Sequence, residues 1–386
     1  MLDANINYFF LLKKSIYVKF EIFSNLIYSL SINMTFSHRL ISWYKIHKRD
    51  LPWRNTKDPY KIWVSEIILQ QTRVNQGLAY YRQFIRQYPD LCSLAEAALD
   101  DVLKAWQGLG YYTRARNLHQ TARYIKFNLN GLFPDNYKDL MRLKGIGDYT
   151  ASAIASFAFG EPVAVVDGNV QRVIARLTGL EIAVNSGEGR KIIKKQAENL
   201  LSSEQPALHN QAMIEFGAIQ CTPRNPECSI CPLNKPCYAY QHNKVHDLPV
   251  KIKQHSQKVR YFYYLKIKHN NHVFMEKRSH KDIWNSLYQF PLIEADNSIN
   301  IHALTNLREW EQIFHGTTHT IKNISRTYTH LLTHQKIIAQ FIEVEIPCAE
   351  ALHLNHCIRM DEASIHQLAI PRLIEKYLEE QPDNPN

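Results

Sequence analysis

The sequence predicts an all-α domain followed by an α+β domain, and three observations support this. From residue 36 to about residue 240, apolar residues recur with helical spacing between short links. The next stretch is polar and basic and contains Pro249, as expected of a linker. Beyond it, residues 260–267 and 336–344 are rich in β-branched and aromatic residues, which is typical of strands. We therefore expect a helical domain, a linker and an α+β domain over residues 34–240, 241–258 and 259–386.

The composition favours a polyanionic partner and an intracellular location. The chain has 386 residues, of which 45% are hydrophobic, so it can form the cores of two domains. Its net charge of +10 indicates binding to nucleic acid or to an anionic membrane, and charge alone does not separate the two. Four of the seven cysteines lie within residues 221–237, as in an intracellular metal site rather than a disulfide framework. We expect a cytoplasmic protein, because no segment has the roughly 20 apolar residues that a membrane span needs.

The first 33 residues differ from the rest of the chain. They are rich in Ile, Phe, Tyr, Leu and Asn without a clear helical period. They have neither the compact apolar core nor the cleavage site of a signal peptide. We expect Met34 to be the true start and residues 1–33 to be a dispensable extension.

A carboxylate lies on the apolar face of a predicted helix. This helix is expected to begin at Asp58 and Pro59, because aspartate is favoured at the N-cap and proline at the first helical position. Glu66 lies four residues after Ile62 and three before Leu69, so it shares their face. Burial raises the pKa of a carboxyl group, and proteins obtain a general acid near neutral pH in this way. The alternative is a glutamate at the edge of the face that reaches solvent.

A glycine-containing loop at residues 108–116 carries aromatic and basic side chains, among them Tyr111, Tyr112 and Arg114. Side chains of these types can insert between stacked bases. The alternative is a tight turn between helices whose tyrosines pack inside.

The helical domain is organised around residues 143–170. Gly145 and Gly147 precede an apolar helix of small residues, and such a backbone can approach an anion and direct its N–H groups at it. This arrangement suits a DNA phosphate. About 20 residues later, Asp167 stands where its carboxylate can face what the glycines hold. In the alternative, Gly145 ends a helix and Asp167 is an ordinary N-cap.

Four cysteines predict a metal centre. Six, two and five residues separate Cys221, Cys228, Cys231 and Cys237. Four thiolates so close in sequence suit zinc or a [4Fe–4S] cluster, and the spacing alone favours zinc. The remaining cysteines have no evident partner and are expected to be packing residues: Cys92, Cys348 and Cys357.

Together these motifs resemble the adenine DNA glycosylases, from residue 36 to about residue 375. The resemblance rests on residues 51–54, 63–72, 108–115, 145–147 and 166–170 and on the cysteine spacing. It implies a helix–hairpin–helix glycosylase domain with a [4Fe–4S] cluster on the four cysteines, in place of zinc, and a Nudix-like C-terminal domain. It also implies an enzyme that flips adenine mispaired with 8-oxoguanine, or more weakly with guanine, out of duplex DNA and hydrolyses its glycosidic bond.

The resemblance assigns roles to residues at matching positions. Glu66 corresponds to the acid that protonates the imidazole-ring nitrogen of adenine, and Asp167 to the carboxylate that stabilises the oxocarbenium-like sugar. Tyr149 and Asn169 correspond to residues that orient these groups. The expected DNA contacts are Arg54, Gln71, Thr72, Leu109, Tyr111, Gly145 and Gly147. For Arg54, the alternative is a structural anchor at the start of a helix.

Tyr149 favours base removal without strand cleavage. The endonuclease III-like relatives carry a lysine at this position and use it as a Schiff-base nucleophile, which a tyrosine cannot be. We therefore expect a monofunctional glycosylase, acting as a monomer on mispaired duplex DNA without a membrane partner.

One alternative is a module that binds mispairs without cutting them, against which Glu66, Asp167 and Asn169 argue. A thymine-glycol or mismatch lyase is a second alternative, against which Tyr149 argues.

The C-terminal domain resembles the 8-oxoguanine reader of the same family. Residues 284–291 match a family strand motif, although Ser286 replaces a common glycine. The usual recognition loop, Phe-Ser-His, is best matched by residues 332–334, where Thr333 keeps a hydroxyl group and His334 follows it. In the alternative, this run begins a buried strand and the histidine lies in a solvated turn. The Nudix-box acidic residues are incomplete, so nucleotide pyrophosphatase activity is not expected.

Overall fold

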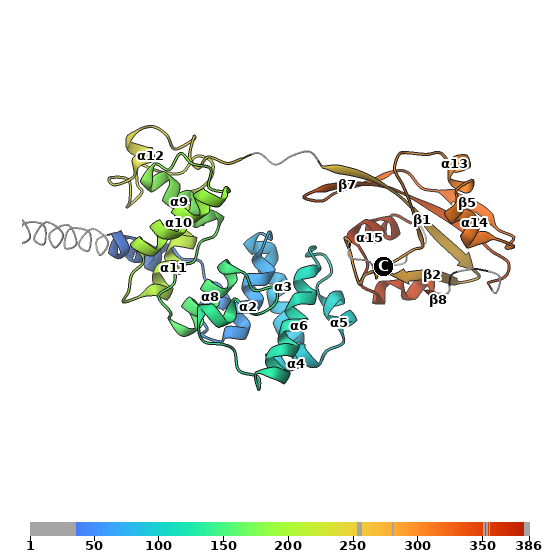
Figure 1. Cartoon of the computed structure of the whole chain (residues 1–386), viewed down its shortest axis with the longest axis horizontal. Coiled ribbons are helices and arrows are strands. Elements are labelled where there is room, and N and C mark those ends of the chain that lie inside the picture. Colours follow the sequence, from blue (N-terminus) through green and yellow to red (C-terminus); the bar gives the residue numbers. More distant parts are fainter. Residues whose placement is uncertain are drawn as a thin grey trace, which may run out of the picture. The chain divides into compact units, whose positions relative to one another are not determined.

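The computed structural model describes residues 36–252, 257–279, 282–349, 352, 354 and 356–381 (Figure 1). The predicted extension at residues 1–33 and the expected start at Met34 lie outside these residues. The chain forms two compact units, one with residues up to Ile67 and Phe133–Lys253, the other with Ile68–Leu132 and Gln254–Asn386. In the part of the chain that the structure describes, no helix has the length and apolar character needed to cross a bilayer.

The first unit is built of helices. It begins with a helix over residues 36–47. As predicted, the next long helix starts at Pro59, and the Asp58 carboxylate accepts a hydrogen bond from the Tyr60 N–H at 2.9 Å. The elements in chain order are η1 (Pro52–Arg54), most of α2 (Pro59–Leu69), α7 (Tyr137–Leu140), α8 (Asp148–Phe159), α9 (Gly168–Thr178), α10 (Gly187–Leu200), α11 (Pro206–Glu215), the π-helical η2 (Phe216–Gln220) and α12 (Tyr238–Gln241).

The core of this unit joins residues that are distant in sequence. Apolar side chains of the helix 36–47, α9, α11 and η2 pack together, including Leu40, Trp43, Val173 and Phe216, all of which are buried. The predicted hairpin connects α7 to α8. Gly145 makes its turn with φ +78°, a conformation that glycine adopts without steric cost.

The chain after α12 continues along the first unit. The Val184 N–H donates to the Val250 carbonyl at 3.0 Å, and the Asn185 side chain binds both backbone groups of Ile252. The expected linker at 241–258 therefore begins against the helices, and its residues 253–256 lie outside the described part of the chain.

The second unit combines four helices with the C-terminal sheet. The helices are α3 (Val74–Gln87), α4 (Leu91–Glu96), α5 (Leu99–Ala105) and α6 (Thr113–Asn128). Polar contacts attach them to the C-terminal residues: the Tyr288 hydroxyl donates to Asp100 at 3.1 Å, and the Gln107 amide donates to Glu375 at 2.8 Å. The predicted domain boundary at residues 241–258 coincides with the change from helices to strands along the chain. In the structure, however, these contacts place helices α3–α6 in the same compact unit as the sheet.

The sheet of the second unit is mixed. Its long central strands run parallel, with Lys258 opposite Gln335 and Lys268 opposite Glu345. The other pairs are antiparallel: β2 and β4 join β1, β5 and β6 join β7, and β3 and β8 join β2. The strands are β1 (Lys258–His269), β2 (His272–Lys277), β3 (Tyr288–Gln289), β4 (Leu292–Ala295), β5 (Thr320–Ile324), β6 (Tyr328–Leu331), β7 (Gln335–Glu345) and β8 (Cys357–Asp361).

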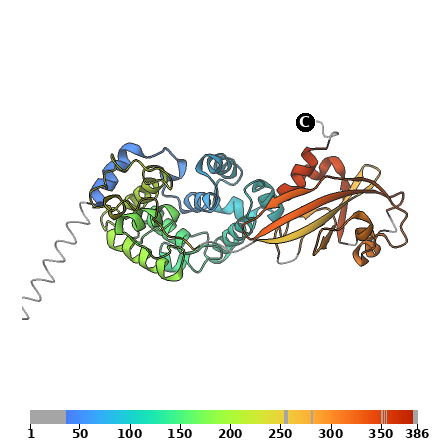
Figure 2. The same ribbon diagram turned by 90° about the horizontal axis from the view of Figure 1, so that it is seen from above.

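The unit combines helices and strands, as predicted, and helices cover both faces of the sheet (Figure 2). On one face Phe262 and Tyr264 pack with Tyr377 of α15 (Arg372–Glu379), and on the other Leu265 packs with Trp310 of α14 (Arg308–Phe314). Successive residues of β1 point to opposite faces, and both faces are buried along its middle, so residues 261–265 form an unbroken apolar run. The remaining elements are α13 (Ile301–Thr305) and η3 (Glu362–Gln367).

Candidate active site

Glu66 is buried on the apolar face of α2. Only 7% of the residue is exposed, so the alternative of a glutamate reaching solvent is wrong. The hydroxyl of Tyr149, in the first turn of α8, donates to Glu66 Oε2 at 2.6 Å. Burial, reinforced by the nearby Asp167 carboxylate, raises the pKa of Glu66 to about 7, although the bond from Tyr149 opposes the rise. Glu66 therefore has a pKa suited to giving up a proton near neutral pH.

Asp167 caps α9 and faces the same region. Its Oδ1 accepts from the backbone N–H groups of Asn169 and Val170 at 2.9 and 2.7 Å, and its Oδ2 accepts from the Asn169 amide at 2.7 Å. The N-cap alternative is therefore correct as a local description. Burial nevertheless raises the pKa of Asp167 above its ordinary value, against the effect of these bonds. The same bonds fix the carboxylate in one orientation.

Arg172 connects this carboxylate to the cysteine segment, and sequence reasoning missed it. Its Nη2 donates to Asn169 Oδ1 at 2.9 Å and to the Gly217 carbonyl at 2.6 Å, while its Nε donates to the Cys221 carbonyl at 2.8 Å. Gly217 is needed because a Cβ there would lie 2.7 Å from the Cβ of Asn169. The available signal was a spacing of three residues between Asn169 and Arg172, which places both on one face of a helix.

The four cysteines expected to bind metal line one cavity. Cys221, Cys228, Cys231 and Cys237 surround it together with apolar residues of α9 and η2. The Arg176 Nη1 lies 3.4 Å from the Cys221 sulfur.

The glycine hairpin presents backbone at the surface of the first unit. Gly145 and Gly147 are exposed, whereas Leu143 and Ile146 beside them are buried. Gly147 is the N-cap of α8, so the free N–H groups of that helix begin here. The hairpin has the geometry expected of an anion site.

Two of the predicted duplex-entering residues have unusual backbone conformations in the second unit. Gln71 has φ +60° and Tyr111 has φ +48°, both in the left-handed region that residues with a Cβ avoid. Arg114 donates to the carbonyl groups of Gln70 and Leu109, and so ties the two segments together. Strain of this kind concentrates at functional sites.

The other residues of this predicted group differ in exposure. Tyr111 is 51% exposed, whereas Leu109 and Tyr112 are buried and Thr72 is partly buried. Tyr111 is therefore exposed, as expected of a side chain that inserts between bases. Tyr112 packs inside, as expected in the alternative of a tight turn.

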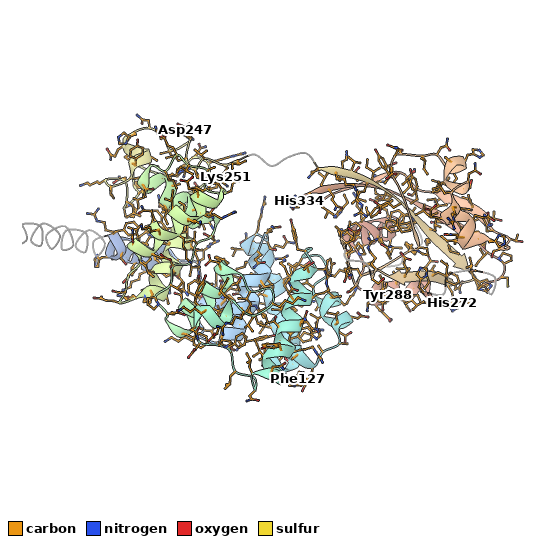
Figure 3. The ribbon with its side chains drawn as sticks, viewed as in Figure 1. Phe127, Asp247, Lys251, His272, Tyr288 and His334 are labelled. Carbon is orange, nitrogen blue, oxygen red and sulfur yellow. The ribbon has the colours of Figure 1, made fainter. Side chains whose placement is uncertain are left out.

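The residues expected to read the lesion form the turn between β6 and β7. Thr333 and His334 are exposed, and Figure 3 labels His334 at this end of the hairpin. The turn leads directly into β7, which is buried from Ile337 onward, so the alternative of a solvated turn before a buried strand describes the local structure correctly. The Thr333 hydroxyl lies 2.6 Å from the Tyr111 hydroxyl. The structure thus brings together two predicted DNA contacts that are 222 positions apart.

Arg54, a predicted DNA contact, is bound by a buried glutamate. Its Nη2 donates to Glu215 Oε2 at 2.6 Å, and only 10% of its side chain is exposed. Burial would raise the pKa of Glu215, but hydrogen bonds from Arg49 and Arg54 lower it to about 2. A buried carboxylate of this kind is costly without its cationic partners. These contacts support the structural anchor, the alternative raised from the sequence, and the DNA contact of Arg54 stays a prediction.

Two family models match the chain in the regions that form the helical and sheet-containing parts. Residues 64–201 match the HhH-GPD superfamily of base excision DNA repair proteins, and residues 262–380 match the NUDIX domain. The fold and the buried acidic site thus define a base excision repair glycosylase of the helix–hairpin–helix class with a Nudix-like C-terminal domain. The corresponding fold prediction is confirmed.

Individual relatives narrow this class. The adenine DNA glycosylase of Buchnera aphidicola subsp. Baizongia pistaciae is 36% identical over 78% of this chain and 83% of the relative. That of subsp. Schizaphis graminum is 31% identical over 89% of this chain and 98% of the relative. A solved structure of a thermostable thymine-DNA glycosylase is also similar, with a TM-score of 0.51 and 31% identity over 54% of this chain and 97% of that one. The chain belongs to the adenine DNA glycosylase family of DNA N-glycosylases.

Proposed function

We propose that this enzyme removes adenine mispaired with 8-oxoguanine, and more weakly adenine opposite guanine, by flipping it out of the duplex and hydrolysing its glycosidic bond. The observation that carries the proposal is the buried pair of carboxylates with different partners. Glu66 holds a phenol hydroxyl at 2.6 Å, and Asp167 is held by Asn169 and the start of α9. When two carboxyl groups have different environments, one can act as the general acid while the other stays ionised and stabilises positive charge.

Glu66 is the proton donor. With its pKa raised to about 7, a large fraction of the side chain is protonated at neutral pH. It delivers this proton to the imidazole-ring nitrogen of adenine. The neutral base then leaves with the electron pair of its bond to C1′ of the sugar.

Asp167 stabilises the cationic sugar that results, and a water molecule then adds to C1′ to complete the hydrolysis. The bonds from Asn169 N–H, Val170 N–H and the Asn169 amide hold the carboxylate in place before the charge develops. Preorganised groups of this kind need no rearrangement during the reaction.

The surfaces that bind DNA are the glycine hairpin and the strained loops. Gly145 and Gly147 offer exposed backbone at the start of α8 for a phosphate. Gln71, Thr72, Leu109 and Tyr111 enter the duplex around the mispair. The left-handed backbone at Gln71 and Tyr111 supports this role, because strained conformations are retained where function requires them.

Thr333 and His334 read the 8-oxoguanine. Both are exposed in a hairpin turn, and Thr333 already contacts the exposed Tyr111. A wedge residue and a hydroxyl that can donate or accept thus lie side by side. This pairing supports recognition of the lesion by the Nudix-like domain together with the 108–116 loop.

The cysteines Cys221, Cys228, Cys231 and Cys237 hold a [4Fe–4S] cluster. A single tetrahedral zinc ion keeps its sulfur ligands about 3.8 Å apart. A [4Fe–4S] cluster is larger than one zinc ion, and the four cysteines line one cavity together with apolar side chains that can enclose it. Burial raises the pKa of the Cys231 thiol to about 12, so its ionisation is coupled to binding a cationic centre. The bound cluster supplies structure, fixing the basic segment 221–237.

The enzyme acts as a monofunctional glycosylase. The Tyr149 hydroxyl is committed to Glu66, and a phenol cannot form the Schiff base that strand cleavage by this class requires. Borohydride reduction during turnover should therefore trap no protein–DNA adduct. Efficient trapping would contradict this assignment.

Single-turnover excision tests the function directly. The substrates are duplexes with one 8-oxoguanine:A, G:A, T:A or G:T pair, and the proteins are wild type, Glu66→Gln and Glu188→Gln, the last a matched change at an exposed residue of α10. We expect fast adenine release from the first duplex, slower release from G:A and none from T:A or G:T. Glu66→Gln should lose this release and Glu188→Gln should keep it. Binding without release by wild type would instead support the non-catalytic module, and thymine release would support a mismatch glycosylase.

A further inference from the structure

A second group of metal-binding side chains lies in the Nudix-like domain. Glu276, His356 and Cys357 each offer one ligand atom, and these atoms all lie within 4.8 Å of one another. Glu276 belongs to β2 and stands directly opposite Cys357, the first residue of β8, in their antiparallel pairing. Figure 1 shows these two strands side by side. The register of the sheet therefore holds the carboxylate and the thiol together, since opposite residues have their Cβ atoms about 5 Å apart.

The three side chains are differently restrained. Glu276 Oε2 lies 3.0 Å from His356 Nε2, while its Oε1 accepts from the amide of Gln289, which is buried. This amide orients the carboxylate as hydrogen-bond partners of metal ligands commonly do. Cys357 is partly buried against the core of the domain. The His356 side chain is 66% exposed, so its ring can adjust its position at little cost.

We propose that Glu276, His356 and Cys357 bind one divalent transition-metal ion, with zinc as the expected ion and water as the fourth ligand. Thiolate, imidazole and carboxylate are the three side-chain ligands that zinc takes in proteins. Tetrahedral zinc brings such atoms to about 3.3–3.8 Å from one another, and the three ligand atoms already lie within 4.8 Å of one another. The alternatives are a simple Glu276–His356 ion pair and the packing role predicted for Cys357.

The bound ion would join the residues that begin β8 to β2. His356 and Cys357 are consecutive, and Cys357 is the first residue of β8. One ion on both of them and on Glu276 would therefore fix the path of the chain as it enters the sheet. Metal binding that requires the folded arrangement also stabilises it.

Metal content of the full-length, cluster-containing protein tests this proposal. The protein is equilibrated with zinc chloride, dialysed against metal-free buffer and analysed for zinc and iron by mass spectrometry. The variants are Glu276→Gln, His356→Ala and Cys357→Ser. The matched controls are Cys348→Ser and His366→Ala, which change an exposed cysteine and an exposed histidine of the same domain outside the group.

We expect about one zinc per chain in wild type and in both controls, with zinc lost from the three variants and iron unchanged throughout. Constant iron shows that zinc has not entered the site of Cys221–Cys237. Cobalt(II) should give tetrahedral absorption bands in wild type but not in Cys357→Ser. No zinc in wild type, or equal zinc in wild type and the variants, would overturn the proposal. If Cys357→Ser fails to fold, the exposed His356→Ala decides the outcome.

Discussion

Replacement of Glu66 by glutamine should stabilise the protein and abolish its activity at the same time. The carboxyl group is buried beside Asp167, and the side chain of Tyr149 donates to it. Glutamine has nearly the same shape and its carbonyl oxygen can accept the bond from Tyr149, but it never becomes charged. The variant therefore avoids the cost of a buried negative charge.

The size of the gain follows from the pKa of Glu66, which rises from 4.5 to about 7 on folding. One pKa step corresponds to about 1.4 kcal/mol, so the whole rise corresponds to about 3 kcal/mol. Because the folded pKa is the higher one, the stability linked to protonated Glu66 is fully present below pH 4.5 and is lost as the pH rises to about 7. Glu66→Gln should therefore match wild type in acid and exceed it by up to about 3 kcal/mol above neutrality.

Thermal unfolding of wild type, Glu66→Gln and Glu188→Gln, followed by circular dichroism at about pH 5 and about pH 8, measures this gain. For a unit of about 200 residues, 3 kcal/mol raises the midpoint by about 6–12 °C. In the same pH range, the wild-type excision rate should fall about tenfold for each pH step above 7, since the acid must be protonated. A gain that is equal at both pH values, or a loss of stability at about pH 8, would refute the buried-acid reasoning.

Three other changes address strain, packing and a polar contact. Ser286→Gly should raise the free energy of unfolding in urea by about 1 kcal/mol, because Ser286 has φ +66°; an unchanged midpoint would exclude strain there. Gly217→Ala should slow adenine release roughly tenfold to a hundredfold with little change in DNA affinity, because its Cβ would approach Asn169 at 2.7 Å. Normal release would show that this contact does not position the site. Tyr111→Phe and Thr333→Val should be coupled by about 0.5 kcal/mol in a stability double-mutant cycle, given their 2.6 Å contact; additive effects would argue against that bond.

Asp167 shows how a local role and a catalytic role can coincide. As an N-cap, it satisfies backbone N–H groups at the start of α9. The same bonds fix the orientation of the carboxylate, whose charge raises the pKa of the nearby buried Glu66. The N-cap role of Asp167 and its proposed catalytic role therefore depend on the same hydrogen bonds.

Much of the fold could be predicted because local patterns were strong. The helix after Asp58, the hairpin at Gly145 and the strands at 260–267 and 336–344 follow from capping, glycine conformation and periodicity. The parallel pairing of those two strands could not be predicted, because it joins residues far apart in sequence, such as Lys258 and Gln335, which are 77 positions apart. The packing predicted for Cys92 and Cys348 was wrong, since both are exposed.

The sequence by itself determined which chemistry this protein carries: a glutamate on an apolar helix face, an aspartate before a helix, and four closely spaced cysteines. These depend on residue type and short spacing, which the chain specifies locally. Only the tertiary structure decided which of these groups meet. Arg54 binds a glutamate 161 positions away, Arg172 links Asn169 to Cys221, and Tyr111 contacts Thr333. Such contacts arise from packing between distant segments, and no local pattern records them.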